Sequence, residues 1–434
     1  MRAIHTIFTS AILLAAASTA CAQDAGKNEK AVPTSPAQCR PLETKTANAP
    51  EQKPAFAGQT RACGVRTETA FEVTVIAKGL DKPWAVEPLP DGSFLITEKA
   101  GRMRIITAKG EVGEPIAGLL PVGQGGVSGE SGAGGLPPIS ARGQGGLLDV
   151  ALSPTFEKDR TIFWSFSEQR EGGSGTSVAS GTLSADRKRL EQVRVIFRAM
   201  PTHDNGLHFG SRLAFGPDGK LYVTLGDRFD KEKTRPQAQH LNSHLGKVLR
   251  INPNGSAPAD NPFAKQQGAL PEIWTIGHRN IQSASFDDQG RLWTIEHGAK
   301  GGDELNLLEK GKNYGWPIIS YGEEYSGEPI PGNITAKAGL EQPVYYWDPV
   351  IAPSGAQYYT GNAFPEWRGS IFIGGLASEM LVRVVIKNDR VVGEEHLLTD
   401  RGQRIRDVRQ GPDGALYVVT DEGNGELLKI APKR

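Results

Sequence analysis

The clearest hydrophobic pattern in the chain lies between Leu207 and Asp227. Apolar and polar residues alternate over 221–225 with a period of two, which predicts a strand with two different faces. Pro217-Asp218-Gly219 stands just before this strand and favours a tight turn, because proline presets φ and glycine accepts a positive φ. The segment therefore predicts a β-hairpin, and His208 stands just ahead of its first strand.

A similar unit, a turn signal or glycine-rich start with a short apolar strand, recurs at spacings of about 45 to 80 residues. The recurrences occupy residues 90–98, 145–166, 217–225, 288–295, 368–373 and 412–419. No long segment has the 3.6-residue period of a helix. A repeated antiparallel unit predicts an all-β protein of the β-propeller class. A two-domain sandwich is the alternative that periodicity alone leaves open.

Composition agrees with this fold class. The chain has 434 residues, with 49 Lys and Arg against 49 Asp and Glu. A net charge of zero does not support nucleic-acid binding, which usually shows a basic excess. The 53 Gly and 29 Pro fit a turn-rich all-β protein better than a helical one.

Residues 1–22 have the pattern of a secretory signal peptide: Arg2, an apolar run over 7–17, and Ala20-Cys21-Ala22 as the cleavage site. The run is too short to span a membrane. A lipidated Cys21 is the alternative, which Ser18 disfavours because an aliphatic residue usually stands at that position. We expect a periplasmic or secreted protein with no membrane span.

Residues 23–67 are rich in Ala, Pro, Lys, Glu and Thr without periodicity, which predicts a linker or a poorly ordered arm. Cys39 and Cys63 favour a disulfide in an oxidising compartment, with two unpaired thiols as the alternative. The propeller is expected over 68–432. The Gly-rich segment 118–143 lacks the following helix and the Gly-Lys-Ser/Thr of a P-loop, so it predicts a flexible surface insertion.

Two arginines are the first candidates for ligand chemistry. Arg404 and Arg406 stand two residues apart, so on a strand their side chains point to one face. Two neighbouring cations repel unless an anion lies between them, and guanidinium groups bind carboxylates and phosphates bidentately. The pattern indicates a clamp for a polycarboxylate or phosphate. The alternative is a solvated edge paired with Asp400 or Asp407.

Two further segments carry weaker signals. Arg279 and Asn280 place a permanent cation beside a neutral amide on an irregular segment, which suits polarising a carbonyl or holding an anion. Residues 296–304 combine glycines with carboxylates and suggest oxygen ligands for Ca²⁺, although the spacing is not that of an EF-hand. The alternatives are a loop of solvated acids and, for His208 alone, a structural or surface histidine.

Taken together, these segments resemble the soluble quinoprotein glucose dehydrogenase and aldose sugar dehydrogenase family. The matching stretches are GQGGLLDVALSP, HFGSRLAFGPDGKLYVTLGD, QAQHLNSHLGKVLRINPNG, IWTIGHRNIQS, GGDELNLLEKGKNYGWP and LTDRGQRIRDVRQGPDG. They cover about residues 70 to 432. The resemblance implies a six-bladed β-propeller of four-stranded antiparallel sheets that carries pyrroloquinoline quinone (PQQ). The aldose sugar dehydrogenase branch is the more similar, because the long insertions of the glucose dehydrogenases are missing.

The resemblance assigns roles residue by residue. His208 matches the general base, which takes the proton of the anomeric hydroxyl, and Arg279 joins it as a catalytic residue beside the reactive quinone carbonyl. The residues that match cofactor contacts are Gln144, Arg279, Asn280, Tyr325, Trp347, Arg404 and Arg406. Tyr325 and Trp347 are the aromatic groups expected near cofactor and substrate.

The resemblance also implies Ca²⁺. The backbone carbonyls of Gly298 and Ala299 match ligands of an ion that bridges to PQQ. The Glu304 side chain and the Tyr314 carbonyl match a second, structural ion.

The sequence departs from the family at three positions. Ala377 stands where the family often has a lysine on PQQ, so one charge contact with the cofactor is absent. Leu207 precedes the base where the glucose dehydrogenases have an acid. Ala299 replaces a common proline, which a main-chain ligand tolerates.

The implied activity is oxidation of an aldose at C1 to the lactone, with an external electron acceptor. The alternatives are a sugar-lactone hydrolase, which would hold Ca²⁺ at the propeller axis with side-chain carboxylates, and a non-catalytic binding propeller. The preferred sugar and the acceptor do not follow from the sequence. A monomer or homodimer is expected.

Overall fold

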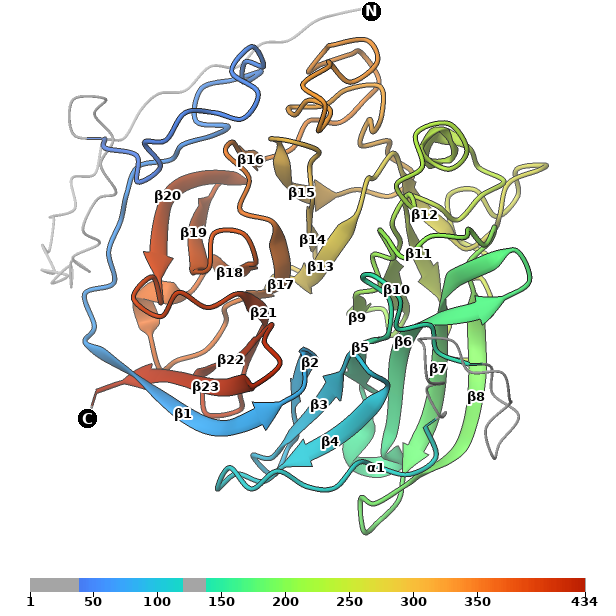
Figure 1. The fold of residues 1–434 in the computed structure, drawn as a ribbon, viewed down its shortest axis with the longest axis vertical. Helices are drawn as coiled ribbons and strands as arrows, with labels where there is room; N and C mark the ends of the chain where they lie inside the picture. Colours follow the sequence, from blue (N-terminus) through green and yellow to red (C-terminus); the bar gives the residue numbers. More distant parts are fainter. Residues whose placement is uncertain (1–38, 120–137, 434) are drawn as a thin grey trace, which may run out of the picture.

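The computed structural model describes residues 39–119 and 138–433. Within these ranges, six antiparallel sheets surround a central axis (Figure 1). From the innermost strand outwards they are β2 (Pro83–Pro88), β3 (Phe94–Glu98), β4 (Arg102–Ile106); β5 (Leu147–Leu152), β6 (Thr161–Arg170), β7 (Gly173–Leu183), β8 (Leu190–Arg198); β9 (Leu213–Phe215), β10 (Leu221–Thr224), β11 (Lys247–Ile251), β12 (Ile273–Ile276); β13 (Ile281–Phe286), β14 (Leu292–Glu296), β15 (Asp303–Leu308), β16 (Tyr345–Trp347); β17 (Pro353–Tyr358), β18 (Ser370–Gly375), β19 (Leu381–Lys387), β20 (Arg390–Leu397); and β21 (Ile405–Gln410), β22 (Leu416–Thr420), β23 (Gly425–Pro432), β1 (Phe71–Leu80).

The six sheets form a closed ring, which confirms the predicted six-bladed β-propeller. The innermost strands contact one another in the order β2, β5, β9, β13, β17, β21 and back to β2. The sheet of β2–β4 has three ladder strands among the described residues, and an irregular segment takes the fourth place. In that segment the Gly113 and Ile116 N–H groups donate to the carbonyls of Ile105 and Met103 at 2.9 and 2.8 Å.

Helix is almost absent from the described ranges. It is confined to α1 (Phe156–Asp159) and two short 3₁₀ turns, η1 (Arg235–Gln239) and η2 (Pro365–Trp367). No helix in the described part of the chain has the length and apolarity needed to cross a membrane.

The recurring sequence unit marks the same place in every blade. The expected hairpin after His208 is β9 and β10, joined by a turn in which Gly219 has φ +70°. All six recurrences fall on the connection between the innermost strand and the second strand of a sheet. Because each innermost strand leads into its hairpin at one end of the axis, the chain that enters these strands gathers at the other end.

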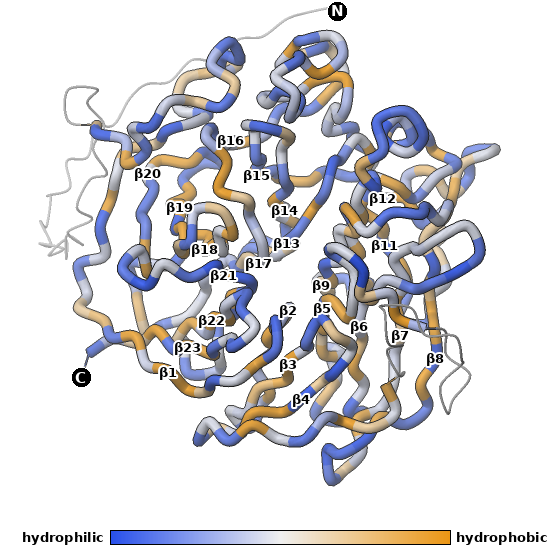
Figure 2. Tube along the Cα trace, in the orientation of Figure 1, coloured by the Kyte–Doolittle hydropathy of each residue, from blue (hydrophilic) through white to orange (hydrophobic). Residues whose placement is uncertain are grey.

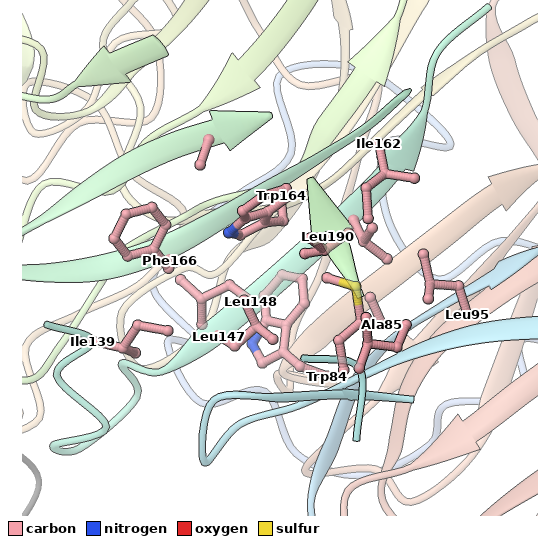
Figure 3. Packing of buried hydrophobic residues seen from close by; sticks show 14 of the residues in the cluster. Trp84, Ala85, Leu95, Ile139, Leu147, Leu148, Ile162, Trp164, Phe166 and Leu190 are labelled. Carbon is pink, nitrogen blue, oxygen red and sulfur yellow. The ribbon is translucent and has the colours of Figure 1, made fainter. Parts of the chain in front are cut away.

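The core consists of apolar layers between neighbouring blades. Figure 3 shows one of them, where Trp84 and Ala85 of β2 pack against Leu148 of β5 and Trp164 of β6. Hydrophobic residues lie mainly along the strands, whereas the loop beside β12 is mostly hydrophilic (Figure 2). Burial of alternate strand positions on both sides of each blade stabilises the ring.

The described part of the N-terminal arm is anchored to the propeller. Cys39 is bonded to Cys63. The Asn48 and Ala49 N–H groups donate to the Asp348 carboxylate at 2.5 and 3.1 Å. These long-range contacts correct the expectation of a poorly ordered arm over residues 39–67, since composition cannot show them. The predicted signal peptide and most of the Gly-rich segment lie outside the described residues.

Candidate active site

A cavity of about 450 Å³ opens where the chain enters the innermost strands. Every blade contributes to its wall, because the starts of the six inner strands meet at this mouth of the axis. The side chains that define it include Trp84, Gln144, Gln282, His297, Arg404 and Arg406. The structure therefore brings three of the predicted cofactor contacts, Gln144 and the two arginines, to one cavity.

The two arginines converge on a carboxylate that sequence reasoning missed. Arg404 Nη2 and Arg406 Nη2 lie 3.0 and 2.8 Å from Asp421 Oδ2. Asp407, one of the two expected partners, pairs instead with Arg212 and Arg409. Burial lowers the pKa of Arg406, an effect that Asp421 opposes. Arg406 Nε is buried without a hydrogen-bond partner, so an incoming anion would satisfy it.

His208 pairs with a second carboxylate that sequence reasoning missed. It is 4% exposed, has φ +49°, and its Nδ1 lies 2.7 Å from Asp227 Oδ1. Trp316 Nε1 donates to Asp227 Oδ2 at 2.8 Å and fixes the carboxylate. Because Nδ1–H donates its hydrogen bond to this carboxylate, Nε2 keeps its lone pair. The backbone N–H of His208 donates to Gln144 Oε1 at 2.9 Å, which ties the histidine to the cavity wall.

The electrostatics of this pair favour a neutral imidazole beside an ionised acid. Burial lowers the pKa of His208 from 6.5, and the neighbouring Arg279 lowers it further, while Asp227 opposes both. Burial alone would raise the pKa of Asp227, but His208 and Arg279 hold it below its usual value. A neutral histidine can accept a proton near neutral pH.

Arg279 and Asn280 lie behind the cavity wall. Arg279 Nη1 donates to the carbonyls of His297, at 3.2 Å, and Gly298. Asn280 Oδ1 accepts from Gly210 N–H and Gln282 Nε2 at 3.1 and 3.2 Å. Arg279 Nε and Asn280 Nδ2 are buried donors without a partner, the kind of group that a bound carbonyl or carboxylate satisfies.

His297 is a further wall residue that sequence reasoning passed over. Its Nε2 lies 2.6 Å from the Pro353 carbonyl. Burial lowers the pKa of His297 to about 3, so this ring is neutral. The only sequence signal was its place in the acidic glycine-rich segment.

The two predicted aromatic contacts have different positions. Tyr325 is exposed, and its ring lies 6.4 Å from Phe229, which packs edge-on against His208 at 5.0 Å. Tyr325 therefore lies at the surface, with the Phe229 ring between it and His208. The Trp347 side chain is buried in the core, with Nε1 donating to Glu394 Oε2 at 3.1 Å. The structure does not bring Trp347 to the cavity, because β16 is the outermost strand of its sheet.

The residues predicted to bind two calcium ions lie within residues 298–314 of the chain. The Gly298 carbonyl accepts a hydrogen bond from Arg279, and Ala299 bridges to Gly301. Among the described residues, no cluster of three or more His, Cys, Asp or Glu side chains is poised to hold a metal. A site here would depend on backbone oxygens.

Glu304 is the predicted ligand whose surroundings most favour a cation. It stands directly opposite Glu296 across β14 and β15, and Asn306 Nδ2 bridges the two carboxylates at 3.2 Å from each. Burial raises the pKa of Glu304 well above its usual range, and the Glu296 charge adds to this. Asn306 Oδ1 is buried and unpaired. A cation would relieve both features, while Tyr314 lies nearby with its ring stacked on His278.

Below the cavity, a network of ion pairs fills the axis. Arg212 Nη1 lies 2.7 Å from Asp149 and 3.2 Å from Asp407, and Arg409 Nη1 lies 2.9 Å from Asp407. Burial raises the pKa of Glu87, at the far end, to about 7. The axial carboxylates are therefore occupied by arginines.

Comparison with known proteins agrees with this geometry. The Glucose / Sorbosone dehydrogenase family profile matches residues 80–429. An aldose sugar dehydrogenase of Escherichia coli is 43% identical over 367 residues, which cover 83% of this chain and 93% of that protein. Quinoprotein glucose dehydrogenase B of Acinetobacter calcoaceticus is 27% identical over 81% of this chain and 85% of its own. The PQQ-bound aldose sugar dehydrogenase of Streptomyces coelicolor superposes with a TM-score of 0.64 at 28% identity, covering 84% of this chain and all of that one.

Proposed function

The chain belongs to the glucose and sorbosone dehydrogenase family, and we propose that it oxidises aldose sugars at C1 to the lactone with PQQ as cofactor. The observation that carries the proposal is a buried, carboxylate-paired histidine beside a cationic cavity. The relatives named above, an aldose sugar dehydrogenase and a quinoprotein, support this reaction class.

The residues present fit PQQ. Its carboxylates match Arg404 and Arg406, and the unpaired Arg406 Nε is one donor that such a group would satisfy. Gln144 in the cavity wall, and Arg279 and Asn280 behind it, would contact the cofactor, with Tyr325 at the surface. When bound, PQQ supplies an acceptor for the hydride that leaves C1.

The protein itself would remove the proton of the anomeric hydroxyl. His208 Nε2 would take it from the anomeric hydroxyl, and Asp227 would stabilise the imidazolium that forms. Arg279 adds positive potential near the developing charge, in a site from which solvent is partly excluded. An external electron acceptor would complete the turnover.

We also propose calcium binding at Glu304 and the Tyr314 carbonyl, and at the carbonyls of Gly298 and Ala299. The cross-strand pair of Glu296, which is buried, and Glu304, which is half-buried, supports the first of these sites. For the second, Arg279 would have to release the Gly298 carbonyl.

Export to the periplasm or beyond is supported by the disulfide, since such bonds persist in oxidising compartments. A sugar-lactone hydrolase is disfavoured by the axial network, because its carboxylates already pair with Arg212 and Arg409.

The test is reconstitution of the purified protein with PQQ and Ca²⁺, followed by dye reduction over a panel of aldoses. We expect saturable PQQ binding and aldose-dependent reduction. Arg406→Ala should weaken PQQ binding about tenfold to a hundredfold, because it removes a charge-assisted hydrogen bond to the cofactor. Arg187→Ala, at an exposed ion pair with Asp91, is the control and should bind normally. Binding of PQQ without oxidation of any aldose would favour a binding propeller, and no PQQ binding would refute the proposal.

A further inference from the structure

One cation in the cavity has no role in the function proposed above. Lys99 follows β3 directly and lines the cavity together with Arg404 and Arg406. Its backbone is fixed on both sides: its N–H donates to the Lys82 carbonyl, and its carbonyl accepts from Leu147 N–H, both at 3.1 Å. The half-buried side chain donates to the Gly143 carbonyl, in the segment that carries Gln144.

The surroundings of Lys99 are strongly positive. Lys82, Lys99, Arg404 and Arg406 line the cavity, and among its described lining residues Asp421 is the one carboxylate. Both arginines already share Asp421. Burial lowers the pKa of Lys99, and Lys82 and Arg406 lower it further, whereas Asp421 acts in the opposite direction. The one carboxylate of Asp421 does not balance the positive charge of the cavity, and an anionic ligand would relieve the remaining repulsion.

Lys99 and Leu376, the neighbour of Ala377, line the cavity from different blades. Leu376 lines the cavity, and its carbonyl accepts from Arg404 Nη1 at 3.0 Å. Ala377, the next residue, is exposed and brings no charge. A cation reaching the cavity from position 99 therefore supplies charge on a wall separate from the two arginines.

We propose that Lys99 is a cofactor-binding residue whose ammonium group binds a carboxylate of PQQ and replaces the charge missing at Ala377. The inference rests on the proposed function. PQQ is a tricarboxylate, so two arginines leave one carboxylate for a further cation. The Gly143 carbonyl orients the ammonium group, and the lysine needs only to exchange or share this neutral partner.

The test measures PQQ affinity directly, by calorimetry or by quenching of protein fluorescence, in Ca²⁺-containing buffer at two salt concentrations. Lys99→Met should raise the Kd for PQQ about tenfold to a hundredfold and reduce its salt dependence. Lys99→Arg should stay within a few-fold of the wild type. Adding Ala377→Lys to Lys99→Met should recover most of the lost affinity, which a purely structural lysine could not explain.

Lys82→Met is the matched control, because Lys82 also lines the cavity but is exposed. It should change the Kd by no more than about threefold. Equal losses in Lys82→Met and Lys99→Met would overturn the direct contact, since general potential would then account for both. An unchanged Kd in Lys99→Met overturns the direct contact too. The same holds if Lys99→Met has a lowered melting temperature and adding Ala377→Lys does not recover its PQQ affinity. Failure of the wild type to bind PQQ would refute the proposed function itself.

Discussion

At the scale of single residues, the candidate site contains a histidine whose backbone has an unfavourable positive φ. His208 adopts a left-handed φ of +49°, which costs free energy for a non-glycine residue and places its ring against Asp227. The backbone N–H of His208 also donates a hydrogen bond to the Gln144 side chain in the cavity wall. Such strain is retained where the surrounding contacts determine the geometry, as they do here.

His208→Gln should separate binding from catalysis. The amide can still form a hydrogen bond but cannot act as a base, so aldose oxidation should fall at least about a hundredfold while PQQ binds normally. Stopped-flow reduction and a PQQ titration measure the two properties. His203→Gln is the control, because that histidine pairs with Asp230 outside the cavity and should leave both unchanged. Activity near the wild-type level in His208→Gln would refute the assignment of the base.

The pKa of His208 gives a second prediction at this scale. Since burial and Arg279 depress it, the imidazole of the PQQ-free protein should titrate below 6.5. The unfolded chain takes up this proton first, so the contribution of His208 to folding stability is lost as the pH falls below 6.5. An NMR titration of ¹³C-labelled histidine, assigned with His208→Gln, checks the value. Asp227→Asn should lower this pKa further, and a midpoint above 6.5 would contradict the electrostatic account.

At the scale of elements, the pairing of β14 with β15 sets two acids opposite each other. Glu296 and Glu304 face across the ladder, a placement that like charges disfavour. Neighbouring groups reduce the cost in part: His278 Nδ1 lies 2.9 Å from Glu296, and Asn306 bridges both acids. Glu304 retains no cationic side-chain partner among the described residues, which is why this strand pair suits an added cation.

Removal of calcium should therefore destabilise the wild type. Chelation should lower its melting temperature, because an ion bound only to the native state stabilises that state. Glu304→Gln should lose most of this sensitivity and, without calcium, should melt above the wild type, since it removes one of two like charges that face each other across the strands. Glu309→Gln, on the exposed turn after β15, is the control and should respond to chelator as the wild type does. Equal melting curves of the wild type with and without chelator would count against a tight site.

At the scale of the whole molecule, the ring is closed by strands from the two ends of the propeller. β1 pairs antiparallel with β23 on the outside of the last blade, so the first described strand completes the last sheet (Figure 1). Its residues alternate in burial: Val73 packs against the apolar core of that blade, while Thr74 faces solvent. Closure of the ring therefore depends on the pairing of β1 with β23, two strands far apart in the sequence, and on the packing of β1.

Val73→Asp should weaken this closure. A charge placed in the apolar layer should lower the melting temperature by roughly 3–8 °C. Thr74→Asp puts the same charge on the opposite face of the same strand and should shift it by about 1 °C or less. Differential scanning calorimetry at one scan rate compares the two. Similar effects of both substitutions would show that β1 does not stabilise the ring through its buried face.

The sequence by itself determined the class of the fold and the identity of the base and clamp candidates. Period-two alternation and glycine-containing turn signals such as Pro-Asp-Gly are local properties, so the innermost hairpin of each blade followed from them, as in β9 and β10. The spacing of Arg404 and Arg406 likewise implied a shared face, and the structure directs both to the cavity. The family motifs extended this to Gln144, which also lies in its wall.

Only the tertiary structure decided which of these residues meet, and with what. Asp227 and Asp421 each follow a strand as an ordinary polar residue, and nothing local distinguishes them from other acids. Trp347 is paired with Asp303 across β15 and β16, yet its indole turns into the core. Closure of the ring brings residues 99, 143, 209 and 404 to one mouth although up to 305 positions separate them in the sequence. Such proximity arises from packing of six blades around an axis, and a strand pattern carries no information about its partners across that axis.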